Sequence, residues 1–140
     1  MLLILYKIQM TRKLFDEWNT IKKIVNEKDE VVEFKEKDIF WTNIGENIGF
    51  EQNGKGKEFS RPVLVVKKLN KRLFFGVPLS TTLRKGTYFY NFQFLKAHKN
   101  SALLVQAKVF DIKRVDTKLG MINSDDFKKL KVQLKELLDL

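Results

Sequence analysis

The sequence predicts a mainly β domain of the α+β class, in which a small, curved antiparallel sheet or barrel lies between an N-terminal and a C-terminal helix. Three observations support this fold class. The 140 residues are the usual length of one domain. Short segments rich in Val, Phe, Tyr and Ile follow one another through the middle, and amphipathic helical patterns stand at both ends. The connections between these segments are too short for the helical crossovers of a parallel sheet.

The first helix is predicted over residues 11–26, where apolar side chains recur at helical spacing and should face the core: Leu14, Phe15, Trp18, Ile21, Ile24 and Val25. Thr11 is placed to cap it, and Trp18 lies in the middle of its apolar stripe, so we expect Trp18 to pack in the core rather than stack on a base. The residues before it hold an apolar run too short for a membrane span or a secretory signal. Either Met10 is the true start, or these residues form an edge strand or a tail. We divide the chain into residues 1–36, a leader with the helix, and residues 37–140, the compact domain.

Five strands and a final helix are expected after this. The strands span residues 38–44, 61–69, 72–80, 87–94 and 102–112, with a tight hairpin at Asn70-Lys71 and another turn at Lys85-Gly86. Ser124 can cap the final helix. Its buried stripe is formed by Phe127, Leu130, Leu134, Leu137 and Leu138.

The positive charge is concentrated in the middle of the chain. The sequence has 27 Lys and Arg against 17 Asp and Glu, a net charge of +10, and all of this excess lies within residues 39–114. Such a field attracts polyanions, above all nucleic acid, although a merely solvated basic face is the alternative. The basic residues lie between predicted strands rather than on one amphipathic helix, which argues against a membrane surface.

Several familiar chemistries are disfavoured. The absence of cysteine excludes disulfides and thiolate metal sites. The single histidine, His98, stands in a lysine-rich segment where we expect a polar turn, without a carboxylate to complete a metal site or a proton relay. Residues 49–55 match the start of a phosphate-binding loop, but Gly56 replaces the hydroxyl residue and a strand follows instead of a helix. We therefore expect neither a metal nor another cofactor.

Pairing of the second and third strands brings two polar residues together. Counted outward from the Asn70-Lys71 turn, the register places Arg61 opposite Ser80, with Thr81 next to it. A guanidinium beside a hydroxyl suits a phosphate group. A solvated arginine at a strand edge is the alternative.

Five motifs in this order resemble the PemK/MazF family of toxin endoribonucleases. They lie in the run KEKDIFWTNIGENIGFEQNGKGKEFSRPVLVVKK and in the later segments FFGVPLSTT and LLVQAKVFDIKR. The resemblance implies an SH3-like small barrel that forms a homodimer, cleaves single-stranded RNA without a metal, and is silenced by a cognate antitoxin across its groove. A complex of toxin and antitoxin can also contact operator DNA.

The resemblance also assigns site residues. It implies that Arg61, Ser80 and Glu51 are catalytic. The expected RNA-binding residues are Gln52, Asn53, Lys55, Thr81, Thr82, Arg84, Lys85, Gln106 and Lys108, while Asp111 matches the late strand of the family. Lys108 stands where many members carry arginine, and the loop before Arg61 is longer than in compact members.

The reaction that these residues permit begins with attack of the ribose 2′-OH on the adjacent phosphorus and gives a 2′,3′-cyclic phosphate, so DNA cannot be cut. Arg61 would stabilise the phosphate charge, and Ser80 and Thr81 would fix the phosphate. The general base is open, with Glu51 as the candidate. A non-catalytic nucleic-acid-binding module and a peptide-binding module are the alternative functions, and we expect a cytoplasmic location.

Overall fold

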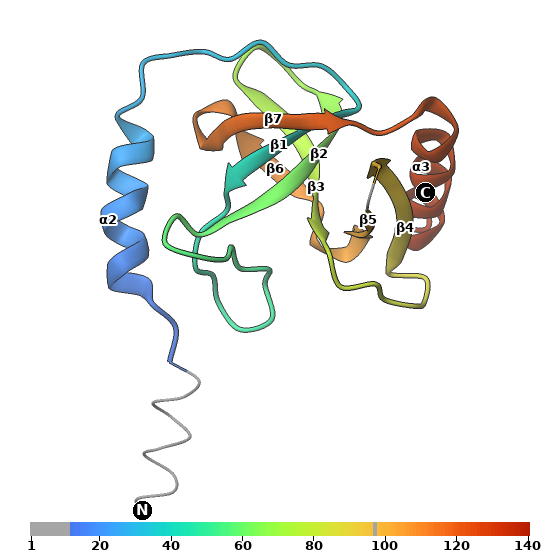
Figure 1. Ribbon diagram of the computed structural model, residues 1–140, viewed down its shortest axis with the longest axis horizontal. Coiled ribbons are helices and arrows are strands. Elements are labelled where there is room, and N and C mark those ends of the chain that lie inside the picture. Colours follow the sequence, from blue (N-terminus) through green and yellow to red (C-terminus); the bar gives the residue numbers. More distant parts are fainter. Residues whose placement is uncertain (1–11, 97) are drawn as a thin grey trace, which may run out of the picture.

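The computed structural model describes residues 12–96 and 98–140, with the expected order of helix, strands and helix (Figure 1). The elements are α2 (Phe15–Asn26), β1 (Asp38–Asn43), β2 (Ser60–Lys68), β3 (Leu73–Ser80), β4 (Phe89–Leu95), β5 (His98–Leu103), the 3-10 turn η1 (Leu104–Gln106), β6 (Lys108–Asp111), the 3-10 turn η2 (Ile112–Arg114), β7 (Val115–Met121) and α3 (Ser124–Leu137). The predicted mainly β, α+β fold with two flanking helices is confirmed.

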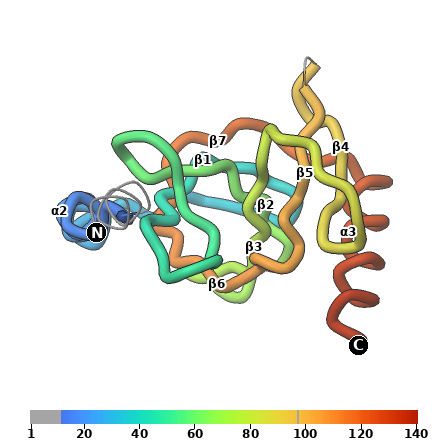
Figure 2. The backbone as a smooth tube through the Cα atoms, turned by 90° about the horizontal axis from the view of Figure 1, so that it is seen from below, coloured from blue at the N-terminus to red at the C-terminus, as the bar shows by residue number. Residues whose placement is uncertain are grey.

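The described strands form one strongly curled antiparallel sheet of seven strands. Six follow the order β4-β5-β3-β2-β1-β7, and β6 pairs with β3. The curl brings the two outer strands together, since a Cβ added to Gly120 in β7 would lie 3.2 Å from the ring of Phe94 in β4. Helix α3 lies beside β4 and α2 lies at the opposite end of the sheet (Figures 1 and 2). The result is a half-barrel with one helix at each end.

Strand β2 separates two hydrophobic cores. Its residues 63–66 are all buried, and successive side chains point to opposite faces of the sheet. Leu64 and Val66 belong to the core that α3 covers with Phe127, Leu130 and Leu134. Val63 and Val65 belong to a second core, with Phe34, Phe40, Ile44, Phe74, Phe110, Ile112 and Val115. A strand covered on both faces explains why this segment is an unbroken apolar run.

The predicted register of β2 and β3 holds from Val63 to Val65, but the predicted turn is wrong. Arg61 and Ser80 lie beyond the last pair of these two strands, and they pair with Thr42 of β1 and Ser101 of β5 instead of with each other. Val63 pairs with Pro78, as expected, whereas near the turn Lys68 pairs with Phe74, one position out of step. The strands are joined by the four residues 69–72, in which the Asn70 side chain accepts hydrogen bonds from two backbone N–H groups. A bulge between Val65 and Lys67 compensates for the longer turn.

Other sequence predictions need correction. Helix α2 begins at Phe15 after an N-cap at Leu14, and Thr11, the predicted cap, lies outside the described residues. Asn123 caps α3 instead of Ser124, because its side chain accepts the N–H of Asp126 at 2.8 Å. The predicted strand at residues 102–112 is interrupted by η1 and followed by η2.

The predicted core positions of the two helices are partly confirmed. Trp18 and Val25 of α2 are buried, but Leu14, Phe15 and Ile24 are exposed. In α3, Phe127, Leu130 and Leu134 are buried, Leu137 is partly buried, and Leu138 follows the helix and is exposed.

Two strands were not predicted as such from the sequence. Residues 98–103 form β5, and His98 therefore begins a strand rather than lying in a polar turn. Residues 115–121 form the edge strand β7, whose polar, mostly exposed side chains lack a strand-like pattern. Both strands take much of their pairing from distant segments, since β5 pairs with β3 as well as β4 and β7 pairs with β1.

Candidate functional site

A hollow of about 260 Å³ lies where the loop after β1 approaches η1 and β6. It is lined by Ile44, Glu51, Gln52, Pro78, Val105, Gln106, Ala107 and Lys108. Four of these residues, Glu51, Gln52, Gln106 and Lys108, were predicted from the sequence as site residues. The fold thus brings together a loop and a late strand that are more than fifty residues apart in the chain.

Gln106 holds in place the loop that carries Glu51 and Gln52. We call residues 44–54 the site loop. The Gln106 Oε1 atom accepts the backbone N–H of Gln52 at 3.0 Å, and its Nε2 donates to the carbonyl of Phe50 at 3.0 Å. One side chain therefore uses both ends of its amide to hold two positions of the site loop against η1.

The site loop is also bonded internally. The Oε1 atom of Glu51 accepts the N–H of Ile48 at 3.0 Å, and the Asn47 side chain donates to the carbonyls of Ile44 and Gln52 at 3.1 and 2.7 Å. The Asn53 side chain accepts the N–H of Asn47 at 2.6 Å. These bonds set the positions of Glu51 and Gln52 at the edge of the hollow.

Arg61 lies half-buried at the start of β2, next to the site loop. Its Nε donates to the carbonyl of Asn53 at 2.5 Å. It is two residues from Val63, which pairs with Pro78, so Arg61 belongs to the sheet face on which Pro78 lines the hollow. Burial lowers the pKa of Arg61 below its usual value, and the charge of Arg84 lowers that pKa further. The two guanidinium groups therefore lie close enough to repel each other.

Lys108 lines the hollow, whereas Arg61 and Arg84 do not. Burial lowers the pKa of Lys108, the nearby charge of Arg114 lowers it further, and Glu51 opposes the change. Among the described residues, no carboxylate lies within 4.0 Å of Arg61, Arg84 or Lys108 as an ion-pair partner. Two pairs of neighbouring cations, Arg61 with Arg84 and Lys108 with Arg114, would therefore be stabilised by an incoming anion.

The residues after β3 form the next part of the site. Ser80 is 6% exposed, pairs with Ser101 of β5, and accepts the N–H of Thr82 at 3.2 Å through its hydroxyl. Thr81, Thr82, Arg84 and Lys85 follow it in an exposed loop. This loop is tied to β5 where the backbone N–H of Arg84 donates to the Ser101 hydroxyl at 2.9 Å. Ser80 thus shapes the start of the loop and is itself largely covered.

Lys55 is not brought to this hollow. It lines a separate hollow of about 320 Å³ with Trp41, Lys57, Glu58, Ser60 and Asp116. Lys55 and Ser60 form an isolated antiparallel bridge, which closes a small turn beyond the site loop. Of the predicted RNA-binding residues, Gln52, Gln106 and Lys108 line the first hollow and Lys55 lines the second. Asn53, Thr81, Thr82, Arg84 and Lys85 line neither hollow.

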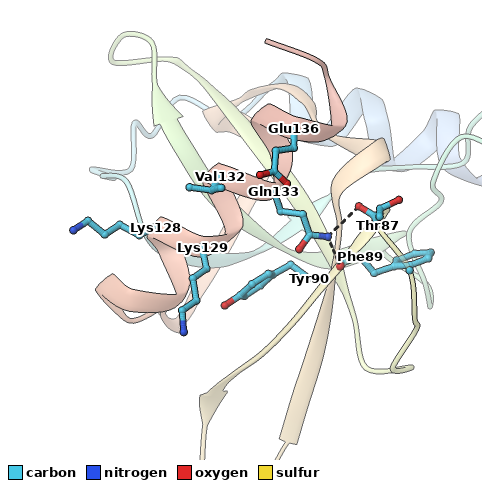
Figure 3. Close-up of a pocket in the computed structure, with 9 residues that line it drawn as sticks. Thr87, Phe89, Tyr90, Lys128, Lys129, Val132, Gln133 and Glu136 are labelled. Atoms are coloured by element: carbon cyan, nitrogen blue, oxygen red, sulfur yellow. Dashed lines mark hydrogen bonds between the residues drawn. The ribbon is translucent and has the colours of Figure 1, made fainter.

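A larger hollow, about 660 Å³, lies between β4 and α3, and none of the predicted site residues lines it (Figure 3). Gln133 reaches from α3 and donates to the carbonyls of Thr87 and Phe89 at 3.0 and 2.8 Å. The Tyr90 hydroxyl donates to Asp126 at 2.7 Å, and burial together with this bond raises the pKa of Tyr90 to about 12. These contacts fasten α3 to the sheet.

Arg114 was not predicted from the sequence as a site residue, although its charge is close enough to lower the pKa of Lys108. Its Nη1 donates to the carbonyl of Asn43 at 3.0 Å, and its guanidinium lies 6.0 Å from the Trp18 ring. The basic ending of the segment FDIKR was the available signal, although the position of Arg114 depends on η2.

Two features are absent from residues 12–96 and 98–140. No three His, Asp or Glu side chains gather there as a possible metal site. Over the same residues, no helix has the length and apolar composition needed to cross a membrane.

Comparison with known structures supports the same fold. The chain is similar to a MazF crystal structure from Deinococcus radiodurans, with a TM-score of 0.62 and 18% identity, covering 80% of this chain and 100% of that one. A mycobacterial endoribonuclease has a TM-score of 0.59 and 13% identity, over 79% of this chain and 97% of its own. A mycobacterial endoribonuclease solved in complex with its cognate antitoxin has a TM-score of 0.58 and 13% identity, over 77% and 97%.

No curated protein sequence is significantly similar to this chain. The family described as PemK-like, MazF-like toxins of type II toxin–antitoxin systems matches residues 35–138, from just before β1 to the end of α3. This match covers every strand and the whole of the hollow. The chain therefore belongs to the PemK-like, MazF-like toxin family of type II toxin–antitoxin systems.

Proposed function

We propose that this protein is a toxin endoribonuclease that cleaves single-stranded RNA without a metal ion. The observation that carries the proposal is a hollow lined by Glu51 and Lys108, beside a site loop whose Asn53 carbonyl is bound by Arg61. Arg61, Arg84 and Lys108 have no carboxylate partner within 4.0 Å among the described residues. Cations held in place before the reaction can stabilise the charge that develops on a phosphate, because they need no reorganisation as it forms.

In the proposed reaction, the ribose 2′-oxygen forms a bond to phosphorus as the bond from phosphorus to the 5′-oxygen breaks. A base takes the 2′-hydroxyl proton, and the departing 5′-oxygen receives a proton. Arg61 binds the non-bridging oxygens, and Glu51, whose Oε1 is held by the N–H of Ile48, is the candidate base. The products are a 2′,3′-cyclic phosphate and a free 5′-hydroxyl.

The remaining predicted residues have supporting roles in this proposal. Lys108 and Arg84 bind the RNA backbone, and Gln52, Asn53 and Gln106 build the wall next to it. Because Ser80 is covered and bonded to Thr82, we assign to it the shape of the phosphate-binding loop. The exposed Thr81, Thr82 and Lys85 contact RNA directly, and Lys55 contacts only RNA that extends beyond the hollow.

The proposal includes partners. MazE–MazF complexes are among the similar structures, and an acidic antitoxin segment would suit the same cationic hollow. We propose a cognate antitoxin, a cytoplasmic homodimer, and contact with operator DNA only in the toxin–antitoxin complex.

The test compares Arg61→Ala with wild type on a long single-stranded RNA in EDTA. We expect a loss of about 10²- to 10³-fold in cleavage rate, because one preorganised donor is removed. Arg72→Ala is the matched control, since Arg72 is an exposed arginine at the other end of the same hairpin. Cleavage only with added metal, or equal rates for the two variants, contradicts the proposal. Salt-sensitive binding without any product supports the non-catalytic module instead.

A further inference from the structure

Helix α2 lies against the site loop, although it precedes the part of the chain that the family match covers (Figures 1 and 2). None of its residues lines the hollow beside Glu51. The helix therefore leaves the hollow uncovered, and it contacts residues of the loop that do not line the hollow.

The first contact is a close fit between Trp18 and Gly45. A Cβ added to Gly45 would lie 2.3 Å from Cε2 of Trp18, so only glycine fits beneath the ring. Trp18 also packs on Phe59, with the ring centroids 5.7 Å apart. The carbonyl of Phe59 accepts the N–H of Gly45 at 3.0 Å, and the carbonyl of Gly45 accepts the N–H of Gly54 at 2.8 Å. Trp18 thus covers the point where the site loop leaves the barrel and returns to it.

The second contact ties the middle of the loop to the chain just before α2. The Lys13 ammonium donates to the carbonyls of Asn47 and Gly49, the latter at 2.8 Å. The backbone N–H of Leu14 donates to the side chain of Glu46 at 3.2 Å. The residues bound to Lys13 flank Ile48, whose N–H holds the carboxylate of Glu51. A displacement at Asn47 or Gly49 would therefore be passed directly to Glu51.

The loop is consequently held from two sides. Gln106 binds it at Phe50 and Gln52 from the barrel, while Lys13, Leu14 and Trp18 bind it at residues 45–49 from the N-terminal segment. We propose that this segment is a positioning clamp for the site loop, with Lys13 as its key residue, and that the clamp fixes Glu51 and Gln52 for cleavage. The kinetic part of this inference rests on the proposed ribonuclease function.

The clamp is tested in the full chain by replacing Lys13 with methionine, which keeps the apolar stem and removes the donors. Hydrogen exchange of the site-loop amides is measured without RNA, and kcat, KM and Tm are measured beside it. We expect roughly tenfold faster exchange at residues 46–54, because both hydrogen bonds that the Lys13 ammonium donates to the loop are lost. We also expect a roughly tenfold lower kcat on RNA with an unchanged Tm.

Two further variants control the experiment. Lys23→Met removes an exposed lysine from the last turn of α2 and should leave exchange and kcat at wild-type values. Lys13→Arg keeps the charge and the hydrogen-bond donors, so its loop exchange and its kcat should be close to the wild-type values. Unchanged loop exchange in Lys13→Met overturns the clamp, and faster exchange with unchanged kcat overturns its positioning role. A wild-type protein that never cuts RNA overturns the ribonuclease proposal, while the exchange measurement still decides whether the clamp exists.

Discussion

Lys108 and Arg61 are held close to other positive charges, and this costs free energy in the free protein. Burial and a neighbouring arginine lower the pKa of each side chain, with Arg114 acting on Lys108 and Arg84 acting on Arg61. Each like-charge contact favours loss of a proton, and a bound phosphate would reverse that preference. The arrangement therefore favours anion binding over stability, as is common at functional sites.

Lys108→Arg should move the alkaline limit of RNA cleavage to higher pH. A lowered pKa means that the Lys108 ammonium loses its proton at a lower pH than an ordinary lysine, so wild-type activity should fall as pH rises through that value. An arginine stays charged throughout this range. The measurement is the pH profile of kcat/KM, corrected for spontaneous RNA hydrolysis, with Lys99→Arg, an exposed β5 lysine, as the control. Identical profiles would show that Lys108 does not set this limit.

Single residues were predictable from the sequence only where a motif carried them. Glu51, Gln52, Gln106 and Lys108 do line one hollow. Lys55, by contrast, is only three residues from Gln52 but faces another hollow, because the chain turns at the Lys55–Ser60 bridge. Lys13 and Arg114 donate to backbone carbonyls of distant segments, the site loop and the end of β1, and no spacing in the sequence encodes these contacts.

At the scale of elements, apolar content decided what could be predicted. Strands β1, β2, β3 and β4 carry strong apolar patterns and were found within a residue or two. The edge strand β7 consists largely of exposed polar residues, so its pairing with β1 leaves no pattern in its own sequence. The tight turn of η1 lies inside an apolar run, where a strand and a 3-10 turn look alike.

Gly45→Ala tests how closely α2 is fitted to the site loop. Gly45 has a φ of +91°, and its added methyl would also strike the Trp18 ring. We expect a loss of about 3 kcal/mol in the free energy of unfolding, from backbone strain and overpacking together. Gly56→Ala, at a φ of +74° with open space around it, is the matched control and should cost only about 1 kcal/mol. The free energy of unfolding is measured by urea denaturation. Equal losses for the two variants would show that the Trp18 ring moves away from the added methyl group at no cost.

At the scale of the whole molecule, two cores and a basic surface have separate tasks. The cores on either side of β2 stabilise the half-barrel. The excess of ten positive charges lies within residues 39–114, and Arg61, Arg84 and Lys108 belong to that segment. Stability and polyanion attraction therefore depend on different residues, and ionic strength should alter the second far more than the first.

Binding of single-stranded DNA, which cannot be cleaved because it lacks the 2′-hydroxyl, should weaken steeply with salt. If about four phosphates are neutralised, the plot of log K against log salt has a slope of about −3. Removing Lys108 should reduce the slope by roughly one contact. The measurement is a titration by fluorescence anisotropy at several salt concentrations. A flat plot would mean that the positive field takes no part in binding.

The bulge near Val66 separates the two ends of the β2–β3 hairpin. If the turn at residues 69–72 lost one residue, straightening the bulge would absorb the loss and leave Val63 opposite Pro78. The remote turn can therefore lose a residue over generations while Val63 stays opposite Pro78 and Arg61 keeps its place beside the site loop.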